Sequence, residues 1–235
     1  MNDLLNNLRE ELISNADEKV KESGMRFFRE NVKLYGIRSA VVERIGKEHY
    51  KFIKDKIKPD ILILCEELWK SGIMEESFIA CNWSYNLHKI YEQSDFETFD
   101  RWVNNYVGNW ASCDTLCNHS VGTLVEMYPQ LILKLKEWAK SEKRWVKRAS
   151  SVSLIVPARK GKFLDDIFEI ADILHSDSDD MVQKGYGWML KAASQAHQEE
   201  VFAYVMGKKA TMPRTSLRYA IEKMPSELKA KAMAK

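Results

Sequence analysis

The sequence predicts an all-α protein, folded as a superhelical solenoid of stacked antiparallel helical pairs with one concave face. Gly and Pro are scarce, 10 and 5 in 235 residues, while the hydrophobic and charged fractions are those of an ordinary globular chain. No stretch alternates apolar and polar residues as a half-buried strand does, whereas apolar residues recur throughout with helical spacing. We expect a single domain over residues 1–235, because one array of this length can bury a continuous core.

The N-terminal elements follow from leucine spacing and from a cap. Leucines at helical intervals predict a helix over 2–14. Asp17 is placed to cap a second helix over 17–31, in which Phe27 and Phe28 would supply apolar contacts.

The next boundaries are marked by turn and cap residues. Gly36 suits a turn with positive φ, and Ser39 can cap the helix that follows it. Pro59 fits the first turn of a helix that ends before Gly72. The remaining helices of this half are expected over 60–70, 75–89, 96–106 and 110–125.

Pro129 is expected to open the next helix, and a basic helix over 142–155 should follow, which Pro157 should end. An acidic turn over 176–180 offers caps for the helix behind it. The other helices are expected over 130–139, 163–174, 181–193, 199–206 and 213–224, with a last one near the C-terminus.

One repeat separates three residues that could share a surface. Trp110, Arg148 and Trp188 lie 38 and 40 residues apart, near the roughly 40–47 residues of HEAT-type helical pairs. Equivalent positions in successive repeats line one face of a solenoid. Asp114 is four residues after Trp110, so both side chains point the same way on a helix. The carboxylate could be a satisfied core acid or a reactive group held beside the indole.

Basic residues gather around these positions. Residues 141–162 hold seven Lys and Arg against one acid, Glu142, which makes a polyanionic partner plausible for this half. Solvated helix faces would explain many of the same charges. The candidates for contacts with phosphate are Lys143, Arg144, Lys147, Arg148, Lys184 and Lys191.

A lone carboxylate is out of place on a surface that binds only phosphate, because it repels the backbone. It suits a substrate that develops positive charge. A purine alkylated at N3 or N7 is cationic, and loss of the base leaves an oxocarbenium-like sugar that a carboxylate and indole faces can stabilise.

Five motifs extend this interpretation along the whole chain. They are Tyr35-Gly-Ile-Arg-Ser39, Asn109-Trp-Ala-Ser-Cys-Asp114, Arg144-Trp-Val-Lys-Arg148, Gln183-Lys-Gly-Tyr-Gly-Trp188-Met-Leu and Arg214-Thr-Ser-Leu-Arg218-Tyr-Ala-Ile-Glu222. With these motifs the sequence resembles the HEAT-like DNA glycosylases of DNA alkylation repair (AlkD-type). It departs from the family pattern at Asp180-Met181, where an aromatic pair is expected, and in its lower net charge.

The resemblance implies an α-solenoid that wraps duplex DNA and excises N3- and N7-alkylated purines without a metal, a cofactor or base flipping into a pocket. It implies that Asp114 is the catalytic carboxylate and that Trp110 and Trp188 contact the deoxyribose and backbone of the lesion. Arg148 would contact a phosphate nearby. The partner would be double-stranded DNA containing alkylated purines, bound by a monomer.

Other classes remain open at this point. The chain could be a non-catalytic HEAT-like module that binds damaged or branched DNA, or a protein-interaction scaffold with an apolar groove. A zinc site at Cys113, Cys117 and His119 is disfavoured, because no second ligand cluster has standard spacing. We find no signal peptide and no apolar run long enough for a membrane helix. The expected location is the cytoplasm, on the nucleoid when DNA is bound.

Overall fold

The structure is a computed structural model that describes residues 2–234. Within that range it is helical, and its one β-type contact is an isolated bridge between Lys33 and Ile73. The predicted fold class, an all-α array of helical repeats, is confirmed. The chain divides into two compact units, Met1–Thr115 and Leu116–Lys235. No helix in the described range is both long and apolar enough to cross a membrane.

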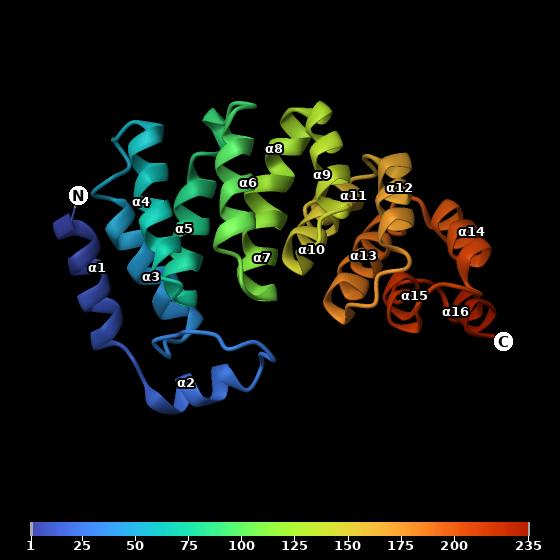
Figure 1. The fold of residues 1–235 in the computed structure, drawn as a ribbon, viewed down its shortest axis with the longest axis horizontal. Helices are drawn as coiled ribbons and strands as arrows, with labels where there is room; N and C mark the ends of the chain where they lie inside the picture. The colour runs from blue at the N-terminus through green and yellow to red at the C-terminus, as the bar shows by residue number, and fades with distance from the viewer. Residues whose placement is uncertain (1, 235) are drawn as a thin grey trace. The chain divides into compact units, whose positions relative to one another are not determined.

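The first unit is built from helices that run side by side in sequence order, with α2 set apart from the others (Figure 1). Its core contains Trp83, Phe99 and Trp102, and the indole N–H of Trp83 donates to the carbonyl of Gly46 at 2.8 Å. The helices are α1 (Asn2–Ser14), α2 (Glu18–Met25), α3 (Ser39–Tyr50), α4 (Lys58–Lys70), α5 (Met74–Asn86), α6 (Asp95–Asn105) and α7 (Trp110–Leu116), with a 3₁₀ turn at His88–Ile90.

The expected helix over 2–14 and the Asp17 cap are confirmed, since the Asp17 carboxylate accepts from two backbone N–H groups of α2. The extension of α2 to residue 31 is wrong. The helix ends at Met25 because it buries none of its residues and has no apolar face to continue. Phe27 is 75% exposed, so its predicted packing is wrong as well. Ser39 begins α3 without making a side-chain cap.

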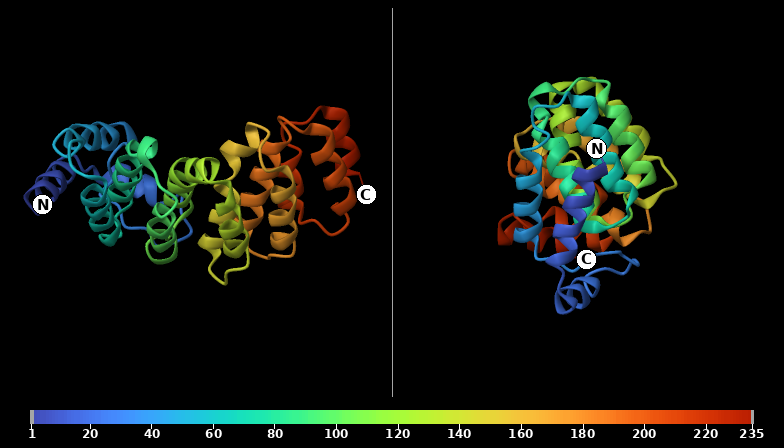
Figure 2. Two further views of the ribbon diagram at one scale, coloured as in Figure 1. Left: turned by 90° about the horizontal axis from the view of Figure 1, so that it is seen from above. Right: turned by 90° about the vertical axis from the view of Figure 1, so that its left-hand side faces the viewer.

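The second unit is organised around α13, which packs against α10, α11, α12 and α15. Figure 2 shows its helices arranged as neighbouring antiparallel rods. The helices are α8 (Gly122–Met127), α9 (Ile132–Ala139), α10 (Arg144–Val152), α11 (Ile155–Arg159), α12 (Leu164–Leu174), α13 (Asp180–Ala193), α14 (Gln198–Lys208), α15 (Arg214–Ala220) and α16 (Ser226–Met233), with a 3₁₀ turn at Pro129–Leu131.

Glycines allow α13 to approach its neighbours closely. A Cβ on Gly187 would lie 2.7 Å from the Cβ of Tyr219 and 2.9 Å from the backbone oxygen of Ser216. A Cβ on Gly185 would lie 2.8 Å from Oγ of Ser151. The motif around Trp188 therefore carries glycine on the helix faces that touch α15 and α10, and a larger residue would push these helices apart.

Two features of the second unit differ from expectation. The single helix expected over 110–125 is interrupted by a π-helical turn at Cys117–Val121. Pro157 does not end the basic helix, which stops at Val152. It lies instead in the first turn of α11, where the missing N–H is tolerated. The bounds of α12 and α13 lie within a residue of those expected.

Candidate functional site

Helix α7 positions the indole and the carboxylate singled out by the sequence. Asn109 caps it: its side-chain oxygen accepts from the backbone N–H of Ser112 at 2.9 Å. Ser112 and Cys113 are buried, whereas Trp110 and Asp114 are half-buried. Asn109, Ser112 and Cys113 therefore fix the helix, while Trp110 and Asp114 remain partly accessible one helical turn apart.

Trp110 is held by a residue that sequence reasoning assigned differently. The Phe28 ring stacks on the indole, with ring centroids 5.4 Å apart and planes inclined by 21°. Trp110 also lines a cavity of about 560 Å³ formed by α2, the loop that follows it, α5 and α7. Phe27, Phe78 and Arg38 line the same cavity. The indole therefore borders an aromatic space with a cation at its edge.

The motif Tyr35-Gly-Ile is fixed by a buried carboxylate on α5. Glu75 is 3% exposed and accepts from the backbone N–H groups of Tyr35, Gly36 and Ile37 at 3.1, 2.9 and 3.2 Å. Gly36 has φ +91, as expected, and a Cβ there would lie 2.6 Å from the Asp17 carbonyl. Three convergent donors stabilise a buried negative charge, so the loop and α5 hold each other in place.

The neighbouring carboxylate on α5 makes a separate set of bonds. Glu76 is fully buried; it accepts from the Arg9 guanidinium at 2.9 Å and from the Tyr35 hydroxyl at 2.7 Å. Burial of the Tyr35 ring, together with this hydrogen bond, raises the pKa of the phenol. Sequence reasoning missed both glutamates, because their donors lie about 40 or more residues away along the chain.

In the second unit, the basic helix α10 faces the acidic turn that precedes α13. Three expected phosphate-binding residues are ion-paired with that turn or with the first residue of α13. The pairs are Arg144–Asp179 at 2.9 Å, Lys184–Asp180 at 2.7 Å, and Lys147–Asp177. These cations therefore already carry an internal counter-charge.

Asp179 has two tasks in this arrangement. Its carboxylate caps α13 by accepting from Met181 and Val182, and it pairs with Arg144. Burial alone would raise the pKa of Asp179, but the hydrogen bonds from Arg144 and Met181 outweigh burial and hold the pKa below its ordinary value. The carboxylate is therefore ionised at neutral pH and remains available to the arginine.

The other predicted residues of this unit lie on α10 and α13 or at their ends. Arg148 is 5% exposed and donates to the carbonyl of Met181 at 2.5 Å. Trp188 is half-buried, and Lys191 lies between its ring and that of Tyr219 while also pairing with Glu222 at 2.9 Å. Lys143 is exposed and occupies the N-cap of α10.

The structure thus brings the candidates together in two groups. Trp110 and Asp114 both lie on α7. Arg148 lies on α10 and Trp188 on α13, and these two helices pack against each other. Whether the two groups converge on one lesion stays a prediction.

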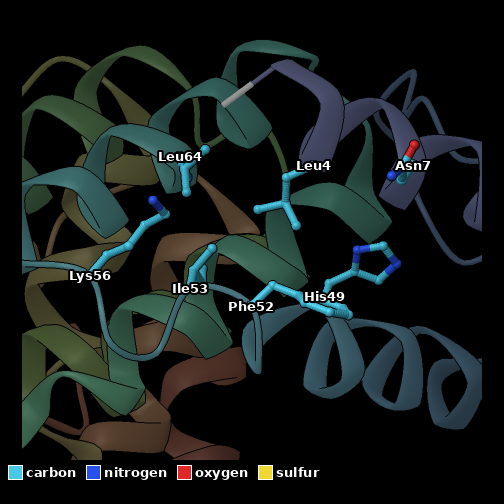
Figure 3. A pocket seen from close by; sticks show the side chains of 7 residues that line it. All are labelled: Leu4, Asn7, His49, Phe52, Ile53, Lys56 and Leu64. Atoms are coloured by element: carbon cyan, nitrogen blue, oxygen red, sulfur yellow. The ribbon is translucent and has the colours of Figure 1, made fainter.

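Metal-binding residues do not cluster in the described range: no group of three or more His, Cys, Asp or Glu there could hold an ion. Cys113 and Cys117 are buried and form no disulfide, while His119 is exposed. A second cavity of about 370 Å³ lies in the first unit, where His49, Phe52 and Lys56 face Leu4 and Asn7 of α1 (Figure 3). None of the motif residues lines this second cavity.

Comparison with known proteins identifies the family and the fold of the chain. The sequence matches the profile of the DNA alkylation repair enzyme family over residues 8–224. The fold is similar to that of a predicted DNA alkylation repair enzyme from Enterococcus faecalis, with a TM-score of 0.80 at 14% identity over 90% of this chain and 98% of that one. A search of curated proteins gave no significant match. Because the family profile spans nearly the whole sequence, the chain belongs to the DNA alkylation repair enzyme family.

Proposed function

We propose that the protein is a monofunctional alkylpurine DNA glycosylase, which excises cationic bases such as 3-methyladenine and 7-methylguanine from duplex DNA in base excision repair. Membership of a DNA alkylation repair family supports a role in repair of alkylated DNA. The observation that carries the finer assignment is the pairing of a half-buried indole and carboxylate, Trp110 and Asp114, one turn apart on α7.

The chemistry asks little of the protein beyond charge stabilisation. Alkylation gives the purine a positive charge, and when the C1′–N bond breaks its electron pair neutralises the departing base. Positive charge then accumulates on the deoxyribose, where a carboxylate and aromatic faces lower its energy. Water forms the new C1′–O bond and loses a proton, and Asp114 orients that water. No strong general acid is needed.

The remaining residues have supporting roles in this proposal. Trp188 contacts the deoxyribose or the backbone of the lesion, and Arg148 contacts a phosphate beside it. Lys143, together with the ion-paired cations of α10 and α13, binds phosphates farther along the duplex. The protein works as a cytoplasmic monomer, associated with the nucleoid when bound, and without extruding the base into a pocket.

The test measures release of 7-methylguanine and 3-methyladenine from methylated duplex DNA under single-turnover conditions, with Asp114→Asn as the variant. We expect wild type to release both bases and the variant to lose at least about a hundredfold in rate, as for removal of a group that stabilises transition-state charge. Thermal unfolding should change little. Full activity of Asp114→Asn would refute the proposed mechanism. If wild type releases neither base, the assignment as a glycosylase is refuted.

A binding function without catalysis is motivated by the departure from the family pattern at Asp180-Met181 and by the modest net charge of +2. In that case the chain would recognise damaged or branched DNA and leave the base in place. Tight, salt-dependent binding in a gel-shift assay with no release of alkylated bases selects this alternative.

A further inference from the structure

The segment between α2 and α3, which we call the arm (residues 26–38), carries several exposed cations. Arg26, Arg29, Lys33 and Arg38 are all exposed, and none forms an ion pair with any residue in the described part of the chain. Residues 26–38 hold these four cations against one acid, Glu30, so the arm has a net positive charge that makes a local positive field.

The predicted phosphate contacts of the second unit present the opposite situation. Arg144, Lys147, Lys184 and Lys191 are each paired with a carboxylate, and Arg148 is almost fully buried. Binding of a phosphate by such a residue must displace an existing partner or share it. The cations of the arm need no such exchange, so they are accessible to a polyanion.

Aromatic residues are interleaved with these cations. Phe27 lies between Arg26 and Phe28 in the sequence and is 75% exposed, so its ring is accessible to a partner. Phe28 stacks on Trp110, so the arm contacts the indole proposed to face the lesion. Exposed aromatic rings beside basic groups are typical of surfaces that bind nucleic acid, where they pack against bases and sugars.

The arm has a defined position, which a specific contact requires. Its C-terminal part is held by the hydrogen bonds of Glu75 to residues 35–37. Its middle is held by the backbone bond from the N–H of Met74 to the carbonyl of Lys33, at 2.9 Å. The cations therefore project from an anchored backbone bordering the cavity of Trp110.

We propose that the arm is a DNA-binding element whose cations hold the phosphates next to the alkylated nucleotide, while Phe27 packs against the same strand. This rests on the proposed function for the identity of the nucleotide but not for the binding itself. The occupant is the sugar–phosphate backbone of duplex DNA, selected by charge and by the neighbouring indole.

The first test compares two double variants that remove equal charge from the first unit. Arg26→Gln/Arg29→Gln alters the arm, and Lys54→Gln/Lys56→Gln alters two exposed lysines that are also unpaired but lie outside it. The probe is an undamaged duplex, with affinity measured by fluorescence anisotropy at several salt concentrations. We expect the arm variant to lose roughly tenfold or more in affinity and to reduce the salt slope by about 1.8, the value for two phosphate contacts.

The second test uses two matched phenylalanines. Phe27 and Phe52 are 75% and 73% exposed, so neither ring is needed for the core. Phe27→Ala should weaken binding of the duplex by about tenfold, within the range of one lost stacking contact, whereas Phe52→Ala should not. Both variants should unfold at the wild-type temperature.

The outcomes separate this proposal from the glycosylase. If wild type binds DNA through the arm but releases no base, the proposal for the arm is supported and the proposed glycosylase activity is refuted. If wild type releases bases while the arm variants match their controls in affinity and salt slope, the arm proposal is overturned and the glycosylase stands. Absence of any DNA binding by wild type at low salt overturns the arm proposal.

Discussion

Replacing Glu75 by Gln should release the loop of residues 35–37 from α5. The carboxylate shares its two oxygens among three backbone donors: Oε1 accepts from Gly36 and Ile37, and Oε2 accepts from Tyr35. Glutamine has the same shape but only one oxygen, so its amide group must face at least one of these N–H groups. The substitution keeps the volume and changes only the hydrogen bonding and charge.

The cost can be worked from these contacts. A buried N–H group left without an acceptor costs about 1–3 kcal/mol. The remaining bonds change from charge-assisted to neutral, which weakens them by roughly half. Together the change should lower the free energy of unfolding by about 2–4 kcal/mol, or roughly 4–16 °C in unfolding temperature for a chain of this size.

The assay combines urea unfolding with hydrogen exchange at the amides of residues 35–37. Glu67→Gln is the control, because Glu67 is exposed and pairs only with Lys70 and should cost less than about 1 kcal/mol. In Glu75→Gln the three amides should exchange faster than in wild type. Unchanged protection there, with a stability equal to that of the control, would show that the buried carboxylate does not hold the loop.

Three further outcomes are expected. Gly187→Ala should lower stability by about 1–3 kcal/mol, since its methyl group meets backbone, whereas Gly207→Ala, in open space on α14, should be neutral or stabilising in thermal unfolding. Asp179→Asn keeps a good cap but removes the carboxylate that pairs with Arg144, so duplex DNA should bind severalfold more tightly; unchanged affinity would contradict this. Burial raises the pKa of Glu126, but its two lysine partners lower it more, to below its ordinary 4.5. The stabilisation by these ion pairs is complete above the ordinary pKa and is lost as the pH falls through the lowered one. Glu126→Gln should therefore be less stable than wild type at about pH 6, and the difference should disappear in acid.

Local chemistry predicted much of the fold. The Asp17 cap, the positive φ of Gly36 and the helix over 2–14 each depend on residues adjacent in sequence, and each is confirmed. The helix over 17–31 is predicted because the spacing of Phe27 fits a helix, whereas in the structure α2 ends at Met25, buries none of its residues and leaves Phe27 exposed. Helical periodicity also runs unbroken through the π-helical turn, so the sequence contains no sign of it.

The candidate site was predictable to the extent that it is local. Trp110 and Asp114 share a helix, as their spacing requires. The pairing of α10 with the acidic turn was missed, because the partners lie about 30 residues apart and each run reads as a solvated surface on its own. The stacking of Phe28 on Trp110 spans 82 positions and left no signal in the pattern of either segment.

The four cysteines have a consequence for a protein that meets alkylating agents. All of them are buried on helices and form no disulfide, and burial raises the pKa of the Cys65 thiol. The thiolate is the form that electrophiles attack, so a neutral, shielded thiol reacts slowly. The same reagents that methylate purines would otherwise consume the protein's own sulfur atoms. The helical core therefore protects the chain chemically as well as holding it together, and alkylation of these thiols would report loss of the fold.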